Sequence, residues 1–407
     1  MLFMHQKSRR LENGTTCKMT HIYGIDTQGL ELEAAASEIA TKIGTWAQDV
    51  DQQARFPAES VSALAEAGFM GLCIPSEFAG QQQTPGVFAA VVEQLAQACP
   101  STAMIYVMHV CASQTFVASQ TLGQRETLLR EVAAGRHLTT LAFSERGSRS
   151  QFWAPVSVLR EDGPENYLTS ASKSWVTSAH HADSFVSSAQ QPGAASPLES
   201  TLYLVPRNAS GVEIVDGFDG MGLRGNDSTP VAITDLKVAK DTLLTTPGAG
   251  AAMILEVVLP WFSVGTAAMA HGLCRAAVAA TQLHLSNAGF EHDGQKLRDL
   301  PNLRARLAEM SCRTEQSRAL LGFTVQQMLG PDEMTPLYVL QSRLSALEAV
   351  LHVTDLAMKA CGGAAFSRHL RIEQMFRDAR AGWVMAPTVD HLQEFVGRAL
   401  TGLPLFS

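Results

Sequence analysis

The chain segment between Leu141 and Thr177 carries side chains that could bind a planar ring. Trp175 has a large flat apolar face, and Thr177 adds a hydroxyl. Side chains two residues apart share one face of a strand, so a wall and a hydrogen-bonding group would lie together. A planar heteroaromatic ligand requires both. The same pattern also fits an ordinary half-buried strand, because Trp and Thr are common in strands.

The region that contains this segment has the pattern of a β domain. Apolar and polar residues alternate in Thr201–Pro206 and Val212–Val215, and Gly, Pro, Asn and Asp interrupt the pattern about every 8 to 12 residues. Asp162–Pro164 is one such interruption, between two predicted strands. We therefore predict an antiparallel β domain over residues 139–246.

The regions on either side of the β domain are helical in pattern. Before it, apolar residues recur every three or four positions, as in Leu32, Ala35 and Ile39, which predicts an N-terminal helical domain over residues 21–138. After it, residues 247–407 predict a C-terminal four-helix bundle. The expected helices there are 248–286, 300–329, 335–361 and 387–400. With residues 1–20 as a flexible tail, the fold class is α+β.

Two kinds of residue on the apolar helices favour packing over chemistry. Met104 and Met108 share one helix face, and Met commonly fills irregular gaps in a core. His109 and His271 stand in apolar helical surroundings, which is typical of a neutral, hydrogen-bonded core histidine. We therefore expect these four residues to be buried.

Four segments resemble motifs of the acyl-CoA dehydrogenase family, in the family's order. Leu141–Ser150 resembles its Thr-Glu-Pro-x-x-Gly-Ser-Asp loop, and Lys173–Thr177 resembles its Lys-x-Trp-Ile-Thr strand. Gly222–Ser228 resembles its Gly-x-Arg-Gly-Ser-Asp-Thr turn. Gly362–Arg380 resembles its Gly-Gly-x-Gly-Tyr segment followed by Arg-Asp-Ala-Arg. The resemblance covers nearly the whole chain and implies a helical, β and helical domain in succession.

The resemblance also implies a cofactor, a substrate and partners. The family binds FAD and oxidises acyl-CoA esters, and a flavin reductase or an electron-transfer flavoprotein exchanges the electrons. The implied FAD-binding residues are Leu141, Phe143, Ser144, Trp175, Thr177, Gly362, Gly363 and Thr388. The implied substrate-binding residues are Arg149, Ser150, Phe262, Ser263 and Ala386. In the family the double-glycine segment holds the FAD of a neighbouring subunit, which implies a homo-oligomer, either a dimer or a tetramer.

The sequence departs from the family where the family's catalytic base is found. Ala386 occupies the position of the usual Glu, and Phe262 occupies the rarer alternative position. Removal of the α-proton of an acyl thioester requires such a carboxylate. Further residues of the family's motifs are replaced at Arg146, Arg149, Gln151 and Ser263. At Asn287 the family has an Arg that helps bind the FAD phosphates. The ordinary dehydrogenase site is therefore changed, although the wall for the flavin is kept.

Three functions are compatible with this combination. The first is a flavoenzyme that binds an acyl-CoA or related thioester and uses molecular oxygen, as a monooxygenase of secondary metabolism does. The second is an acyl-CoA dehydrogenase with a relocated base, for which Asp390 and His391 are the candidates. The third is a protein that binds flavin or acyl-CoA without turnover.

Composition narrows the classes of partner. The net charge of −8 argues against nucleic acid and anionic membrane surfaces as partners. Only 17% of the residues are charged, which suits a chain that covers much of its surface in subunit contacts. The seven cysteines include no Cys-x-x-Cys pair, so we expect reduced thiols, no metal site and a cytoplasmic location.

Overall fold

The computed structural model describes residues 21–215 and 217–406. The predicted tail over residues 1–20 lies outside the described residues. The N-terminal part consists of five α-helices. They are α1 (Thr27–Gln53), α2 (Ala58–Glu66), α3 (Pro85–Ala98), α4 (Pro100–Ala118) and α5 (Arg125–Ala133). Two of these helices begin at a side-chain cap: the Asp26 side chain accepts from the backbone N–H of Gly29 at 2.8 Å, and Thr84 caps α3 ahead of Pro85.

The β domain contains two sheets. The strands are β1 (Thr139–Ala142), β2 (Arg160–Glu161), β3 (Asn166–Val176), β4 (Ser184–Gln190), β5 (Ser200–Pro206), β6 (Val212–Ile214) and β7 (Thr229–Ala239). One sheet has the order β1-β4-β5 and the other β2-β3-β7-β6. The strands pair antiparallel, as predicted, except that β1 and β4 are parallel. The long connection between them, which contains β2 and β3, brings the chain back in the same direction.

The C-terminal part is again helical. Its elements are α6 (Gly250–Met253), a π-helical segment Ile254–Val258, α7 (Leu259–Asn287), α8 (Pro301–Gln327), α9 (Thr335–Cys361), α10 (Gly363–Phe366), α11 (Ile372–Val384) and α12 (Val389–Leu400). The continuous helical stretch Gly250–Asn287 has the length and hydropathy of a membrane span, but 61% of its most apolar window is buried inside the protein. That burial is what a core helix of the bundle shows.

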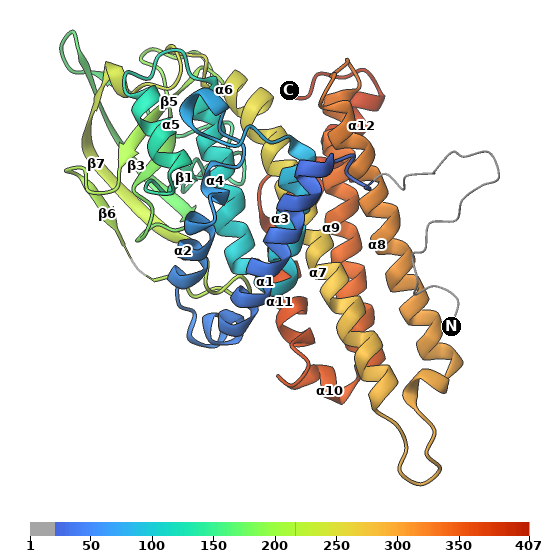
Figure 1. Ribbon diagram of the computed structural model, residues 1–407. Helices are drawn as coiled ribbons and strands as arrows, with labels where there is room; N and C mark the ends of the chain where they lie inside the picture. The colour runs from blue at the N-terminus through green and yellow to red at the C-terminus, as the bar shows by residue number, and fades with distance from the viewer. Residues whose placement is uncertain (1–20, 216, 407) are drawn as a thin grey trace.

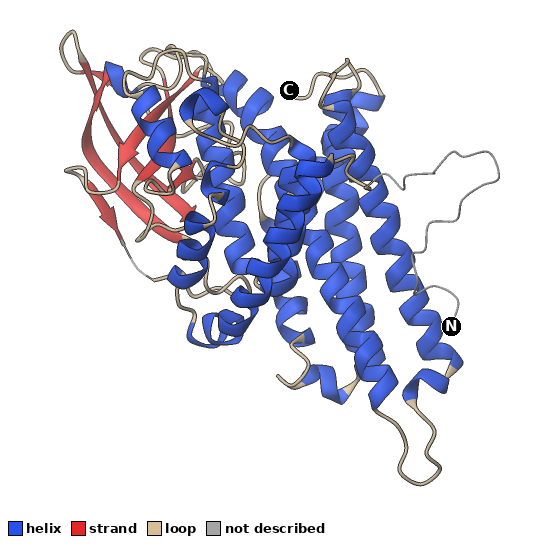
Figure 2. Ribbon diagram, in the orientation of Figure 1, coloured by secondary structure: helices blue, strands red, loops and turns tan. Residues whose placement is uncertain are grey.

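The sheets lie on one side of the molecule and the long helices α7, α8 and α9 on the other (Figures 1 and 2). The N-terminal helices α1, α3 and α4 stand between them (Figure 1). One hydrophobic core runs through both helical parts, and a second, smaller core lies within the β domain. The helical, β and helical succession predicted from the sequence is confirmed. Helix α4 is buried along nearly its whole length, so it is central to the fold.

The described cysteines are all free thiols. Five of them are buried and Cys312 is exposed; the buried ones are Cys73, Cys99, Cys111, Cys274 and Cys361. Burial raises the pKa of the Cys274 thiol to about 12. No cluster of His, Cys, Asp and Glu among the described residues could hold a metal ion.

Candidate active site

A cavity of about 690 Å³ opens where the three parts of the chain meet. Its wall comes from α4, the loop after β1, the end of β3, the loop before β7, the start of α7 and the end of α11. Nine of the residues predicted from the sequence line it: Leu141, Phe143, Ser144, Arg149, Ser150, Trp175, Thr177, Phe262 and Ala386. The structure therefore brings together residues that are far apart in the chain.

Four other predicted residues lie away from this cavity. Gly362 and Gly363 are exposed at the junction of α9 and α10, with open space around both. Thr388 caps α12, because its hydroxyl accepts from the backbone N–H of His391 at 3.3 Å. Ser263 is fully buried in α7 beside Phe262. The open surroundings of the double glycine leave room for a contact with another subunit.

The two candidate bases do not line the cavity. Asp390 is exposed in the first turn of α12, where a carboxylate favours the positive end of the helix. His391 packs edge-on against Trp153, at 5.6 Å between ring centroids, and parallel to Phe395. The position of both residues is set by the N-terminus of α12. The short distance in sequence from Ala386 to these two residues did not indicate their positions, because a new helix begins at Val389.

The rim of the cavity holds an unusual number of residues with left-handed backbone. Trp175 (φ 57°), Arg149 (φ 52°), Ser150 (φ 68°) and Leu223 (φ 50°) all line the cavity. Such conformations cost free energy in residues other than glycine and gather at functional sites. At Trp175 the register of β3 with β7 shifts, and the indole is 66% exposed. The flat face predicted for a planar ligand is therefore free of protein contacts over much of its area.

A polar group of side chains lies next to Trp175. The Thr177 and Ser228 hydroxyls are 3.1 Å apart, and both residues line the cavity. Asn226 lines it as well, and its buried Oδ1 has no hydrogen-bond partner among the described residues. A buried polar atom without a partner is costly unless a ligand or water satisfies it. The sequence pattern indicated Thr177 but not Asn226.

The loop after β1 is fixed by a buried ion pair that the sequence analysis missed. Lys173 Nζ lies 2.6 Å from Glu145 Oε1, and both side chains are almost fully buried. Glu145 also accepts from the Ser157 hydroxyl at 2.5 Å and from the backbone N–H groups of Val156 and Ser157 at 2.6 and 2.8 Å. Burial alone would raise the pKa of Glu145, but the Lys173 charge and these hydrogen bonds hold it below its usual value.

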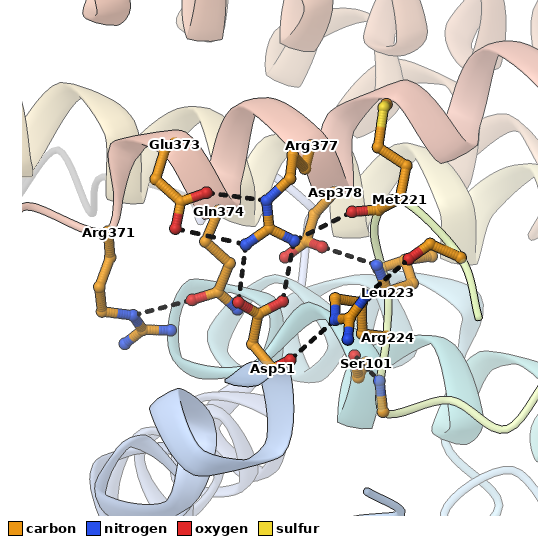
Figure 3. Close-up of polar contacts among 12 residues, drawn as sticks. Asp51, Ser101, Met221, Leu223, Arg224, Arg371, Glu373, Gln374, Arg377 and Asp378 are labelled. Atoms are coloured by element: carbon orange, nitrogen blue, oxygen red, sulfur yellow. Dashed lines mark hydrogen bonds and ion pairs between the residues drawn. The ribbon is translucent and has the colours of Figure 1, made fainter. Parts of the chain in front are cut away.

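The opposite rim is a junction of all three parts of the chain (Figure 3). Arg377 of α11 pairs with Asp51 of α1, with Nη2 at 2.7 Å from Oδ2, and donates to the Met221 carbonyl at 3.0 Å. Asp378 accepts from the backbone N–H of Leu223 at 2.7 Å. Gly222 approaches this helix so closely that a Cβ would lie 2.5 Å from the Arg377 carbonyl oxygen. The junction positions the loop that carries Asn226.

The inner side of the cavity is apolar. Met104 and Met108, which the sequence pattern assigned to packing, are buried and also line the cavity. The packing interpretation is confirmed for His109: its Nδ1 accepts from Thr139 N–H at 3.3 Å and its Nε2 lies 3.1 Å from the Met70 carbonyl. Burial lowers the pKa of His109 to about 4, so it is neutral.

Comparison with known proteins identifies the family. The models of the N-terminal, middle and C-terminal domains of acyl-CoA dehydrogenases match residues 26–136, 140–236 and 248–400. The chain belongs to the acyl-CoA dehydrogenase family. It is 27% identical over 339 residues to the mitochondrial short-chain specific acyl-CoA dehydrogenase of Bos taurus, an alignment that covers 82% of this chain and 80% of that protein.

Solved structures show the same fold. Butyryl-CoA dehydrogenase from Megasphaera elsdenii superimposes with a TM-score of 0.88 at 18% identity, covering 93% of this chain and 99% of that one. The FAD complex of PigA superimposes with a TM-score of 0.85 at 18% identity, covering 93% and 98%. The acyl-CoA dehydrogenase fold of this chain is thus confirmed.

FAD is the cofactor of this flavin-dependent oxidoreductase, and the cavity fits it. The free indole face of Trp175 suits the flat ring, and Thr177, Ser228 and the unpartnered Asn226 suit its polar edge. FAD supplies a group that accepts or donates two electrons. The protein supplies the wall, the hydrogen-bonding groups and the exclusion of water on the side of Met104 and Met108.

The cavity differs from a dehydrogenase site in its acid–base groups. Among the residues that line it, Glu145 is the one carboxylate, and no histidine lines it. Glu145 is committed to Lys173, Val156 and Ser157. The described residues therefore offer no free general base at the cavity wall.

Proposed function

We propose that this protein is an FAD-dependent oxygenase that acts on an acyl thioester. The observation that carries the proposal is the missing base: Ala386 and Phe262 line the cavity where the family places its carboxylate, and Glu145 is held in an ion pair. Dehydrogenation requires removal of a proton from the carbon next to the thioester. Insertion of an oxygen atom does not depend on a carboxylate at that place.

The family and an exposed arginine at the rim of the cavity support a coenzyme A ester as the substrate. Arg149 is exposed at the rim and forms no salt bridge within the described part of the chain, so its charge is available to the phosphates of coenzyme A. One atom of O2 enters the acyl group and the other leaves as water. The two electrons that this requires come from a flavin reductase or an electron-transfer flavoprotein. The dehydrogenase with a relocated base remains the alternative outcome of the test.

The test compares the wild type with Ala386→Glu. Both proteins are incubated with FAD, a flavin reductant, 18O2 and a panel of acyl-CoA esters, and the products are followed by mass spectrometry. We expect the wild type to incorporate 18O. We expect the variant to fold normally, because residue 386 is only partly buried, and to lose most oxygenation while gaining enoyl-CoA formation.

A second incubation without oxygen separates the alternatives. A dehydrogenase bleaches its bound FAD when the acyl-CoA ester is added anaerobically, whereas an oxygenase does not. If the wild type forms enoyl products as fast as Ala386→Glu and incorporates no label, the oxygenase proposal is wrong. In that case a residue outside the cavity wall must supply the base.

A further inference from the structure

Arg343 of α9 is a fully buried cation that forms no ion pair with any of the residues that the structure describes. Its side chain is among the largest that are fully buried in the described residues. Nη2 donates to the Met385 carbonyl at 3.2 Å, and the guanidinium carbon lies 4.7 Å from the centroid of the Phe262 ring. Nε and Nη1 have no hydrogen-bond partner within the described part of the chain. Two N–H-bearing atoms are thus buried and unsatisfied.

The other buried Lys or Arg among the described residues is paired: Lys173 forms an ion pair with Glu145. The partly buried Arg318 likewise pairs with the buried Glu93. An ion taken out of water costs several kcal/mol unless an opposite charge and hydrogen bonds offset the loss. Burial lowers the pKa of Arg343 to about 9, which still leaves it protonated at neutral pH. The protein therefore retains a positive charge here that its own described residues do not neutralise.

The contacts of Arg343 place it directly behind one end of the cavity. Phe262 and Met385 both line the cavity, and both touch the guanidinium. Phe262 and Ala386, the residue after Met385, are the two positions at which the family carries its carboxylate. In this chain both positions are apolar. The positively charged Arg343 thus lies behind positions 262 and 386, neither of which carries the family's negatively charged carboxylate.

We propose that the ligand supplies the missing anion: Arg343 makes the cavity select acyl thioesters with a carboxylate on the acyl group. This inference rests on the proposed function, because it assumes a thioester in the cavity. The anion is attracted through the Phe262 ring, since a low-dielectric wall screens charge weakly. Nε and Nη1, which have no partner within the described residues, are the donors that such a carboxylate would use, since it matches the planar fork of a guanidinium.

The test uses pairs of esters that differ only in charge. FAD-loaded protein is titrated calorimetrically with malonyl-, succinyl- and glutaryl-CoA and with the corresponding terminal amides. We expect at least one acid to bind about tenfold or more tightly than its amide, which is about 1.4 kcal/mol. Arg343→Met should abolish this preference, and Arg343→Lys should retain part of it. Arg306→Met, a change on α8, is the matched control and should keep the preference.

The melting temperature without ligand distinguishes recognition from a structural role. Removal of an unpaired buried charge should leave the ligand-free Arg343→Met protein at least as stable as the wild type. A lower melting temperature of this variant, with the preference for acids unchanged, would show that Arg343 only holds the Met385 carbonyl. Equal affinity of the wild type for every acid and its amide contradicts the inference and leaves the proposed function standing. Failure to bind any ester contradicts the proposed function itself.

Discussion

Individual residues of the cavity wall fall into two groups: those held by the protein and those left free. Trp175 is the clearest free residue, because strain at its backbone turns a large aromatic face outward. Within the described residues, Asn226 of the wall has an acceptor without a partner, and Arg343, which lies behind the wall, has donors without one. Glu145 and Arg377, by contrast, have their polar atoms engaged within the chain. Free groups on a rigid wall are the ones that a ligand can use.

Trp175→Ala tests the flat wall. Because the indole is 66% exposed, its truncation leaves the core intact and should change the melting temperature of the FAD-free protein very little. The affinity for FAD should fall about tenfold or more, since a large aromatic contact is lost. Ser144→Ala should weaken binding less. A collapse of the FAD-free melting temperature in either variant would instead assign that residue to the core.

Asp378 should make stability depend on pH. Burial raises the pKa of Asp378 to about 7 from an ordinary value of 3.8. The folded state then holds this proton more tightly than the unfolded state. The contribution of Asp378 to the free energy of unfolding is therefore fully present below about pH 4 and is lost as the pH rises through 7. Asp378→Asn keeps an oxygen acceptor for Leu223 and removes the titration.

The measurement is urea unfolding of both proteins at pH 5 and pH 8. The free energy of unfolding of the variant, minus that of the wild type, should rise from pH 5 to pH 8 by on the order of 2–3 kcal/mol. A difference that is the same at both pH values would show that Asp378 does not titrate in this range.

At the scale of elements, the cavity depends on one loop, residues 143–157, which is tied to β3. The backbone N–H groups of Ser174 and Arg146 donate to the carbonyls of Ser144 and Ser172, at 2.8 and 2.9 Å. The ion pair of Lys173 with Glu145 joins the same two segments through their side chains. The shape of this loop therefore depends on the end of β3 as well as on the hydrogen bonds that Glu145 accepts within the loop.

Lys173→Met should destabilise the protein by about 3–5 kcal/mol, because it leaves Glu145 buried and unpaired. Urea unfolding measures the loss, and FAD affinity should fall with it, since the loop carries Ser144. The matched control is Arg160→Met, which breaks an exposed pair with Asp235 and should cost less than about 1 kcal/mol. Equal costs for the two changes would contradict the role assigned to the buried pair.

Sequence reasoning succeeded where a local pattern decides the structure and failed where distant segments meet. The predicted helices 335–361 and 387–400 and the strand 201–206 match α9, α12 and β5 closely, because period and breakers define them. Trp175 and Thr177, indicated by their spacing and by the resemblance to the family's strand, both line the cavity. The parallel pairing of β1 and β4 has no local signal, since it depends on the return of the chain.

The same limit explains what the sequence did not indicate at the site. The ion pair of Lys173 with Glu145 joins residues 28 positions apart across a bulged strand, which no spacing rule predicts. Arg343 looks like any surface arginine of an amphipathic helix until α9 is placed against α7. Asp390 and His391 were candidates because they follow Ala386 in sequence, but the start of α12 takes both away from the cavity.

At the scale of the whole molecule, we propose that a second copy of the chain completes the site. Gly362 and Gly363, which resemble the family's segment that holds FAD across subunits, are exposed next to α10. Phe366, at the end of α10, is 84% exposed, and Trp383 at the end of α11 is 52% exposed. Large exposed apolar side chains are typical of a contact surface.

Phe366→Asp should therefore weaken assembly without unfolding the chain. Light scattering should show a dimer or tetramer for the wild type and smaller particles for the variant. FAD should be lost more readily from the variant, because the neighbouring copy no longer contributes. A wild-type protein that is monomeric yet binds FAD tightly would contradict this proposal.

The positions of the cysteines allow local opening of the helical parts to be measured by thiol labelling. In the described residues Cys312 is exposed, so a maleimide should label it at once, whereas Cys73 and Cys274 can react only when the surrounding helices separate. The sequence has no cysteine between Cys111 and Cys274, so the β domain stays silent. In a variant that lacks Cys17 and Cys312, the labelling rates of Cys73 and Cys274 can be measured separately. Comparing the two rates shows how often the N-terminal and the C-terminal helical parts open locally.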